Sequence, residues 1–67
     1  MIVKIEKYNQ NGEGIAFFQN KPIYIFGSII GEEIEIKLIN QKEKYSIGEI
    51  VNIIEPSKNR RIEIIIN

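Results

Sequence analysis

Isoleucine dominates the apolar content of this chain. Eighteen of its 67 residues are Ile, and apolar residues make up 43% of the sequence. Because β-branched side chains are stiff in helices and pack well on a pleated surface, this composition favours strands. The chain has no Cys and no His, so disulfides and zinc fingers cannot support a domain this short. The fold must therefore be held together by apolar packing.

Alternation of apolar and polar residues predicts five strands and no substantial helix. The expected strands cover residues 2–8, 15–18, 23–26, 32–38 and 44–55, with turn-forming residues between them. The fourth segment shows the pattern most clearly, since Ile34, Ile36 and Leu38 share one face and charged residues occupy the other. Gly48 interrupts the alternation of the fifth segment, as expected at a β-bulge. Five short strands with glycine-rich corners predict an all-β fold, a small antiparallel barrel.

The charges of the chain balance overall but not locally. Lys and Arg number 9, and the 9 acidic residues are all Glu. The resulting net charge of zero argues against strong, sequence-independent binding of polyanions. Residues 1–55 carry six Lys and eight Glu, whereas residues 56–67 carry three cations and one Glu. A nucleic-acid surface would therefore have to be local. No apolar run approaches the ~20 residues of a membrane-spanning helix, and a cytoplasmic setting fits the composition.

One ordered series of landmarks goes beyond a general β pattern. It consists of Gly-Glu-Gly-Ile-Ala at 12–16, Ile-Tyr-Ile at 23–25, Gly-Glu-Glu-Ile-Glu-Ile at 31–36, Tyr-Ser-Ile-Gly-Glu-Ile at 45–50 and Glu-Pro-Ser-Lys-Asn-Arg at 55–60. In order and spacing the series resembles the TRAM domain. That domain occurs at the N-terminus of RNA 5-methyluridine methyltransferases and at the C-terminus of tRNA methylthiotransferases.

The resemblance implies a five-stranded OB-like barrel over residues 1–61, with residues 62–67 as a tail or a short extra strand. It implies binding of tRNA or rRNA for an attached catalytic domain, most closely that of an S-adenosylmethionine-dependent methyltransferase. In that family the Ser-x-x-Arg stretch leads into a cysteine cluster. Here Ser57 and Arg60 match, but residues 64–66 are Ile. With no nucleophile and no cofactor-binding glycine-rich unit, the chain itself is expected to hold no cofactor and not to be an enzyme.

Aromatic and basic residues are the candidates for RNA contact. Alternation places Phe17 and Phe18 on opposite faces, so that one should be core, and we expect Phe18 and Tyr24 to point outward, where bases could stack. The basic candidates lie in the loop before the fifth strand, where OB-like barrels often contact oligonucleotides, and near the C-terminus. The full predicted set is Phe18, Lys21, Tyr24, Lys42, Lys44, Lys58, Arg60 and Arg61. The alternatives are cross-strand aromatic packing and an ordinary solvated charge run.

Two other patterns favour simple structural explanations. Gly12 and Gly14 could cradle a phosphate, but a strand rather than a helix follows them, so a turn is favoured. A metal site at Glu32, Glu33 and Glu35 lacks supporting ligands, and charge that keeps the surface soluble is favoured instead. The sequence leaves open a second functional class, a protein-interaction or self-associating barrel that uses residues 62–66 to extend a sheet edge.

Overall fold

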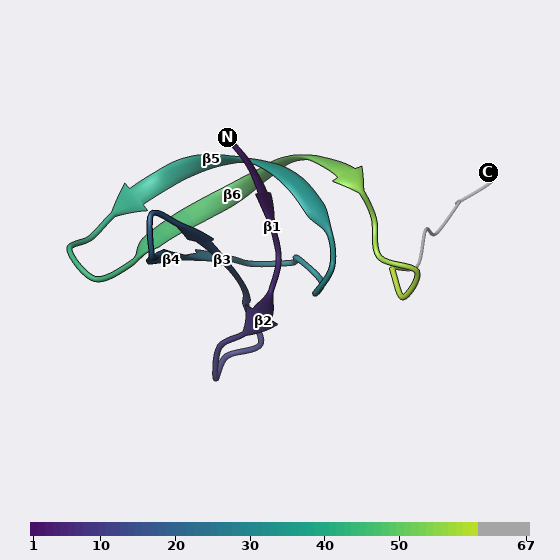
Figure 1. The fold of residues 1–67 in the computed structure, drawn as a ribbon, viewed down its shortest axis with the longest axis horizontal. Coiled ribbons are helices and arrows are strands. Elements are labelled where there is room, and N and C mark those ends of the chain that lie inside the picture. The colour runs from purple at the N-terminus through teal and green to yellow at the C-terminus, as the bar shows by residue number, and fades with distance from the viewer. Residues whose placement is uncertain (61–67) are drawn as a thin grey trace, which may run out of the picture.

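The structure, a computed structural model, describes residues 1–60, and every regular element within them is a strand. These are β1 (Ile2–Lys4), β2 (Lys7–Tyr8), β3 (Gly14–Phe18), β4 (Lys21–Ile25), β5 (Glu33–Gln41) and β6 (Ser46–Glu55) (Figure 1). The prediction of an all-β fold is confirmed. Among the described residues there is no helix of the length and hydropathy that crossing a membrane requires. The tail expected at residues 62–67 lies outside the described part of the chain.

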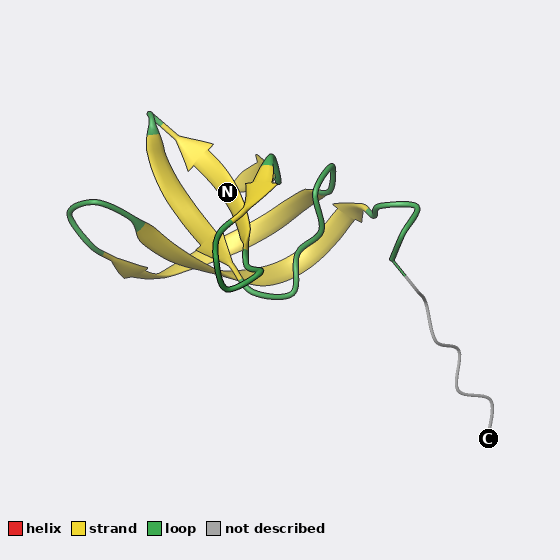
Figure 2. Cartoon of the chain, turned by 90° about the horizontal axis from the view of Figure 1, so that it is seen from below, coloured by secondary structure: helices red, strands yellow, loops and turns green. Residues whose placement is uncertain are grey.

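The strands form one strongly curled sheet in the order β1-β5-β6-β4-β3-β2 (Figures 1 and 2). All neighbours are antiparallel except β4 and β6, which pair in parallel from Ile23–Ser46 to Ile25–Gly48. Two details therefore differ from the sequence-based expectation of five antiparallel strands. There are six strands, and one of the pairs is parallel.

The extra strand arises because the N-terminal segment divides at Ile5 and Glu6. β1 pairs with β5 at one edge of the sheet, and β2 pairs with β3 at the other. The backbone N–H of Ile5 donates to the carbonyl of Glu32 (2.9 Å), and that of Glu6 donates to Ile15 (2.9 Å). The segment thus changes partner at this point and joins the two edges. Counted as one bent strand, β1 and β2 complete a partly open, five-stranded barrel.

The core lies inside this curl and consists mainly of Ile. Its buried members are Val3, Ile5, Ala16, Ile23, Ile25, Ile34 and Ile36, with Leu38 and Ile50 packed against them. The predicted inner face of β5 is therefore confirmed. Gly48 faces the same core, because a Cβ at this position would lie 2.9 Å from Cδ1 of Ile36. The β5–β6 register shifts between Leu38 and Asn40, opposite Gly48, so the predicted irregularity is also confirmed.

Three register shifts bend the long β5–β6 hairpin. Each shift leaves one residue without a cross-strand partner: Ile39 on β5, and Val51 and Ile54 on β6. All three are exposed, with Val51 the most at 59%. Bulges increase local twist and bend a strand, so these positions explain how two long strands can wrap around so small a core. They also place apolar side chains in solvent.

The β3–β4 hairpin turns through Gln19 and Asn20, whose φ angles are 52° and 66°. Positive φ at both central residues is typical of a type I′ turn. Lys21 and Pro22 consequently belong to β4 rather than to the turn expected from the sequence. Because β6 pairs only with Ile23 to Ile25, the tip of this hairpin projects past the core.

The projecting tip explains why one prediction about the aromatic residues is wrong. Phe17 and Phe18 do alternate, but neither is core, with 39% and 49% of their surfaces exposed. They pair across the hairpin with Pro22 and Lys21, beyond the last residue that β6 covers. Both rings are therefore available at the surface.

Candidate nucleic-acid interface

The two ends of the barrel differ in chemistry. One end, called the polar end here, is made by residues 27–32 and 57–60. The other, called the open end, is made by residues 18–21 at the β3–β4 turn and residues 41–46 at the β5–β6 loop (Figure 1). The predicted site residues are divided between these two ends and the outer face of β4.

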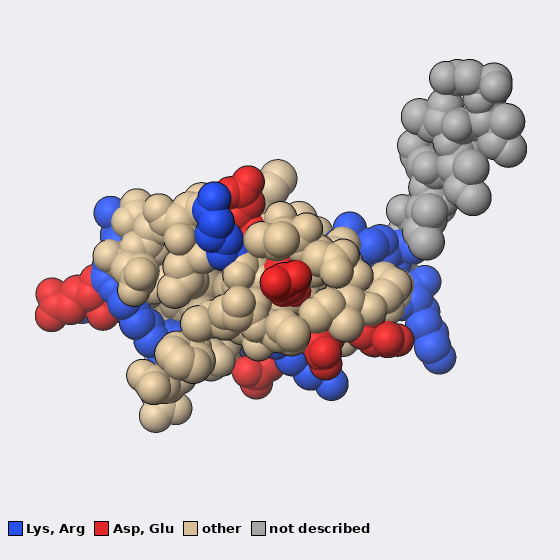
Figure 3. Space-filling model, turned by 90° about the horizontal axis from the view of Figure 1, so that it is seen from above, with Lys and Arg blue, Asp and Glu red and all other residues tan. Residues whose placement is uncertain are grey.

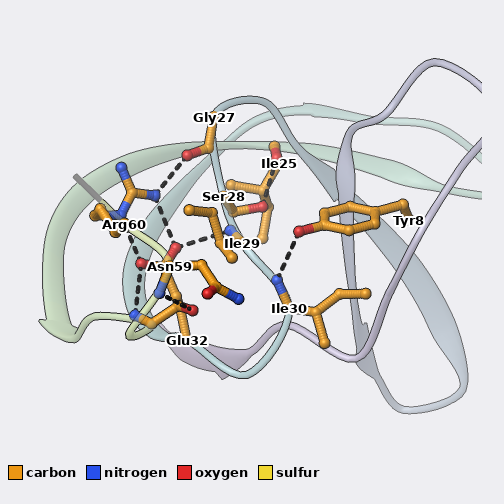
Figure 4. A network of polar contacts seen from close by, with 10 residues as sticks. Tyr8, Ile25, Gly27, Ser28, Ile29, Ile30, Glu32, Asn59 and Arg60 are labelled. Carbon is orange, nitrogen blue, oxygen red and sulfur yellow. Dashed lines mark hydrogen bonds and ion pairs between the residues drawn. The ribbon is translucent and has the colours of Figure 1, made fainter.

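A buried carboxylate organises the polar end. The side chain of Glu32 has no solvent-exposed surface and receives a bidentate ion pair from Arg60 (Figure 4). Nε of Arg60 donates to Oε2 at 2.6 Å, and Nη2 donates to Oε1 at 2.7 Å. Nη2 also donates to the carbonyl of Gly27 at 2.6 Å. Within residues 1–60 this is the only ion pair, and its planar geometry suits the guanidinium group.

Backbone groups complete the coordination of Glu32. The N–H of Ile29 donates to Oε1 at 2.8 Å, and the N–H of Ser57 donates to Oε2 at 3.1 Å. Each carboxylate oxygen therefore accepts two hydrogen bonds, which uses the full acceptor capacity of the group. A buried charge is tolerable only when it is paired and hydrogen-bonded in this way.

The same contacts set the ionisation of the pair. Hydrogen bonding from Arg60, with help from the N–H groups of Ser57 and Ile29, outweighs burial and lowers the pKa of Glu32 to about 2. The hydrogen bond to Glu32 in turn raises the pKa of Arg60. Both groups are therefore charged at neutral pH, and the pair strongly resists protonation.

The two sequence landmarks Gly-Glu and Ser-x-x-Arg meet at this site. Gly31 has a φ of +91°, a conformation that glycine adopts without steric cost. This turn presents Glu32 to the interior. On the other side, Ser57 Oγ accepts from the N–H of Asn59 (3.1 Å) and its carbonyl accepts from the N–H of Arg60 (3.0 Å). The resulting turn brings the guanidinium back onto the carboxylate.

These contacts change the interpretation of two residues. The expectation that Glu32 is a solubilising surface charge is wrong, because it is fully buried, although Glu33 is exposed as expected. RNA contact by Arg60 stays a prediction, but its guanidinium is already engaged with Glu32 and Gly27. Lys58 is exposed at this end. Arg61, also a predicted contact, lies outside the described residues.

The glycine-rich segment before β3 forms a turn, as favoured from the sequence. Gly12 has a φ of +79°, and its N–H donates to the carbonyl of Asn9 at 3.1 Å. Gly14 already belongs to β3, and the hydroxyl of Ser28 occupies the space that a Cβ would need. That hydroxyl donates to the carbonyl of Ile25 at 2.7 Å. Gly14 therefore permits a close approach between two backbone segments.

The aromatic rings on the outer face have partners within the chain. Tyr24 stacks on Tyr45 with ring centroids 5.0 Å apart and an interplanar angle of 22°. Lys7 Nζ lies 5.3 Å from the centroid of Phe17. Tyr24 is consequently half-buried rather than freely outward, and it follows the alternative of aromatic packing. Phe18 has neither an aromatic pair nor a cation partner among the described residues.

The open end contains a pocket beside Phe18. It has a volume of ≈ 290 Å³ and is lined by Phe18, Gln19, Lys21, Ile23, Leu38, Gln41 and Ser46. Its lining spans β3, β4, β5 and β6, so the barrel fold alone creates it. The loop that carries Lys42 and Lys44 connects the last two lining positions, and both lysines are exposed. The fold therefore places Phe18 and Lys21 in the pocket and Lys42 and Lys44 in the loop next to it, although these residues come from separate parts of the sequence.

Sequence reasoning did not identify three of the pocket residues. Gln19, Gln41 and Ser46 are uncharged polar residues near turns, a class with no strong signal in a single sequence. Gln19 is unusual for its position, because the first residue of a two-residue hairpin turn with positive φ is typically Asn or Gly. This was the one sequence feature that could have drawn attention to it. The remaining charges give no simple signal either, because cations and carboxylates are interspersed on the face shown in Figure 3.

The fold and the open end define a class of protein before any comparison is made. A partly open β-barrel that presents an unpaired aromatic ring and several lysines at one mouth has the features of a small oligonucleotide-binding module. The sequence matches the TRAM domain family over residues 1–51. The chain belongs to this family, and the resemblance noted from its landmarks is confirmed.

Known relatives agree with that membership. The chain is 43% identical over 58 residues to the 23S rRNA (uracil(1939)-C(5))-methyltransferase RlmD of Psychromonas ingrahamii, an alignment that covers 87% of this chain and 13% of that protein. It is 45% identical over 49 residues to an uncharacterized RNA methyltransferase of Clostridium tetani, covering 73% and 11% of the two chains. This chain thus spans roughly an eighth of the curated relatives that it matches.

A solved structure shows a similar fold. The solution structure of a conserved protein of Methanococcus maripaludis superposes with a TM-score of 0.72 at 29% identity. The match covers 76% of this chain and 73% of that one. The two chains therefore share a similar fold over about three quarters of their lengths.

Proposed function

We infer that this chain is an RNA-binding module whose main contact surface is the open end of the barrel. The observation that carries this inference is a pocket lined by Phe18 and Lys21, next to the exposed loop that carries Lys42 and Lys44 between the lining residues Gln41 and Ser46. Lysines supply affinity through phosphate groups, whereas an exposed aromatic ring can stack on a base. Lys58 is a further candidate for phosphate contact. Because it lies at the polar end, it would add to the RNA-contacting surface without being part of the main site.

The biological context of the proposal comes from the relatives. Those named above are RNA methyltransferases, one of them specific for a uracil of 23S rRNA. We propose that the barrel helps to present RNA to a catalytic domain that uses S-adenosylmethionine. Among RNAs, rRNA is the substrate that the comparison with these relatives favours most. In this arrangement the barrel contributes binding and the catalytic domain contributes the chemistry. A cytoplasmic setting, where rRNA is modified, belongs to the same proposal.

The zero net charge of the chain is compatible with this function. The Arg60 cation and the Glu32 anion neutralise each other inside the polar end, so the pair contributes little to the electrostatic potential at the surface. At the open end Lys21, Lys42 and Lys44 outnumber Glu43. A few phosphate contacts of this kind give modest affinity that depends clearly on salt.

The experiment that tests this proposal is an anisotropy titration of a labelled single-stranded rRNA fragment at several salt concentrations. Affinity should fall linearly on a log–log plot, and the double variant Lys42→Ala/Lys44→Ala should reduce the slope by about 1.4, since each phosphate contact contributes about 0.7 for single strands. The matched control is Lys4→Ala/Lys37→Ala, which removes the same charge from exposed positions elsewhere. Absence of binding at low salt, or equal effects of the two double variants, would contradict the proposal.

Docking onto a protein partner is the second candidate. It is favoured by the exposed apolar residues Ile39, Val51 and Ile54, which the β-bulges place in solvent. Exposed apolar groups of this kind are typical of surfaces that another protein covers. Light scattering distinguishes a self-associating barrel, which would form a dimer that Val51→Lys dissociates. A monomer that binds RNA favours the first function.

A further inference from the structure

We propose that the pocket at the open end accepts one unpaired nucleobase, with Phe18 as its stacking surface. The proposal rests on the RNA-binding function above and adds the part of the RNA that is recognised and the residues that recognise it. It assigns Gln19, Gln41 and Ser46 to the edge of the base and Lys21 to the adjoining phosphate. These residues line one continuous pocket.

The size of the pocket fits a single base. A volume of ≈ 290 Å³ corresponds to about ten water molecules at about 30 Å³ each. A single nucleobase is smaller than about ten water molecules together, so it can enter such a space with room left for its sugar or for a few waters. Most drug-sized ligand sites are larger, at about 300–1,000 Å³. A folded RNA element could touch only the rim, so the ligand that enters must be a base turned out of its stack.

The chemistry of the lining also fits a base rather than an anion. Ile23 and Leu38 give the pocket an apolar floor that is fixed by the core. The amides of Gln19 and Gln41 each offer both donors and an acceptor, and Ser46 offers a hydroxyl. Lys21 is the only cation in the lining. Uncharged groups that both donate and accept complement the edge of a base, whereas a phosphate would need several cations.

The turn conformation gives a second, independent indication. Gln19 has a φ of 52°, although a side chain of this type rarely adopts the left-handed region and Gly or Asn would be favoured there. Its side chain nevertheless lines the pocket. Strained backbone positions tend to occur at functional sites. The presence of a Gln at this position is explained if its amide binds a ligand.

The neighbouring aromatic residues show why Phe18 is the stacking surface. Phe17 is already covered by Lys7, and Tyr24 is stacked on Tyr45. Phe18 remains 49% exposed and forms one wall of the pocket. It lies beside Lys21 in the cross-strand register, so a base on the ring would have its phosphate within reach of the ammonium group.

The first test measures binding of labelled eight-nucleotide RNAs made of uridine, cytidine or adenosine, and of a matching strand without bases. We expect the strand without bases to bind the intact protein most weakly. Phe18→Ala should lower affinity for the strands that carry bases about 5- to 150-fold, the range for loss of one stacking contact. The salt slope should not change. Phe26→Ala is the matched control, since that ring is 83% exposed and lies outside the pocket.

The second test separates the role of Gln19 from its effect on the fold. Gln19→Gly should raise the melting temperature, because glycine removes the strain of the positive φ. The same variant should weaken binding of the strands that carry bases. Gln41→Ala should reduce the differences in affinity among the three base types while leaving the salt slope intact. A variant that is more stable and yet binds less well cannot be explained by damage to the fold.

The outcomes distinguish this inference from the function on which it rests. If the intact protein binds none of the RNAs at low salt, both proposals fail. If it binds with a salt slope that Lys42→Ala/Lys44→Ala reduces, but Phe18→Ala and Gln41→Ala behave like Phe26→Ala, the RNA-binding function stands and the base pocket is refuted. If Phe18→Ala does not fold by circular dichroism, Phe18→Leu replaces it with the same expected direction.

Discussion

The polar end and the open end of this barrel differ in how their charged side chains are placed. At the polar end, Arg60 and Glu32 bind each other with every acceptor site filled, and the carboxylate is shut off from water. At the open end, Lys42 and Lys44 are exposed and have no carboxylate partner among the described residues. The difference shows that a cation paired with a buried carboxylate stabilises the fold, whereas an exposed cation without such a partner is free to bind a ligand. Residue type alone does not decide between these two roles.

The comparison extends to the landmarks that define the family. Gly31, Glu32, Ser57 and Arg60 all meet at the polar end. They hold the chain after β6 against the loop before β5. Two of the five landmark segments, at residues 31–36 and 55–60, thus serve to hold the two parts of the barrel together. Most of the residues proposed to contact RNA lie at the other end, and of the residues that line the pocket there only Ile23 and Ser46 belong to a landmark segment.

The largest expected effect comes from breaking the ion pair. Arg60→Ala leaves Glu32 buried without its main partner, a change that typically costs about 3–5 kcal/mol. For a domain of this size, such a loss is a large fraction of total stability. Urea denaturation of the two proteins measures it, and Lys58→Ala, which removes an exposed charge two residues away, should change stability by less than about 0.5 kcal/mol. Equal effects of the two variants would contradict the structural role of Arg60.

A slightly smaller effect is expected from pH. The pKa of Glu32 falls from 4.5 to about 2 on folding, so the folded state binds this proton less well than the unfolded state. The pair therefore stabilises the protein fully above about pH 5, and the stabilisation, about 3 kcal/mol, is lost as the pH falls toward 2. Melting temperatures recorded between pH 7 and 2 measure this loss. Glu32→Gln should remove that part of the pH dependence and lower stability at pH 7, whereas Glu33→Gln should preserve both.

The smallest effect on stability is expected at the open end. Lys42→Ala/Lys44→Ala removes exposed charges from a loop that contacts little else, so the free energy of unfolding should stay within about 0.5 kcal/mol of the original value. The same double variant is expected to weaken RNA binding, as described above. Thermal denaturation measures the first property and anisotropy the second. A strongly destabilised double variant would show that the two ends are not separable in the way proposed.

The sequence predicted the parts of this structure that depend on local pattern. Alternation identified the inner face of β5 through Ile34 and Ile36, and Gly48 marked an irregularity that the structure contains. The exposure of both Phe17 and Phe18 could not be predicted, because it depends on where the pairing between β4 and β6 stops. Local alternation carries no information about that boundary.

The candidate site was predictable only in part for a similar reason. Lys42 and Lys44 stood out because a polar loop before a long strand is a common contact region in such barrels. Arg60 was predicted to contact RNA because it lies in the basic group near the C-terminus. Its ion pair was not predictable, because Glu32 is 28 residues away in sequence and resembles part of a surface charge run. The pocket residues come from four strands, and only the folded chain brings them together.

The bent N-terminal segment has a consequence for how the barrel forms. Lys7 pairs with the nearby Ile15, whereas Ile2 pairs with the distant Glu35, so β1 can complete the sheet only after β5 has been synthesised. Contacts between residues so distant in sequence slow folding, since the intervening loop must be ordered before they form. Until β1 pairs with it, the edge of β5 is open to wrong partners. Closing of the barrel by β1 is thus the step that ends its exposure to misassembly during synthesis.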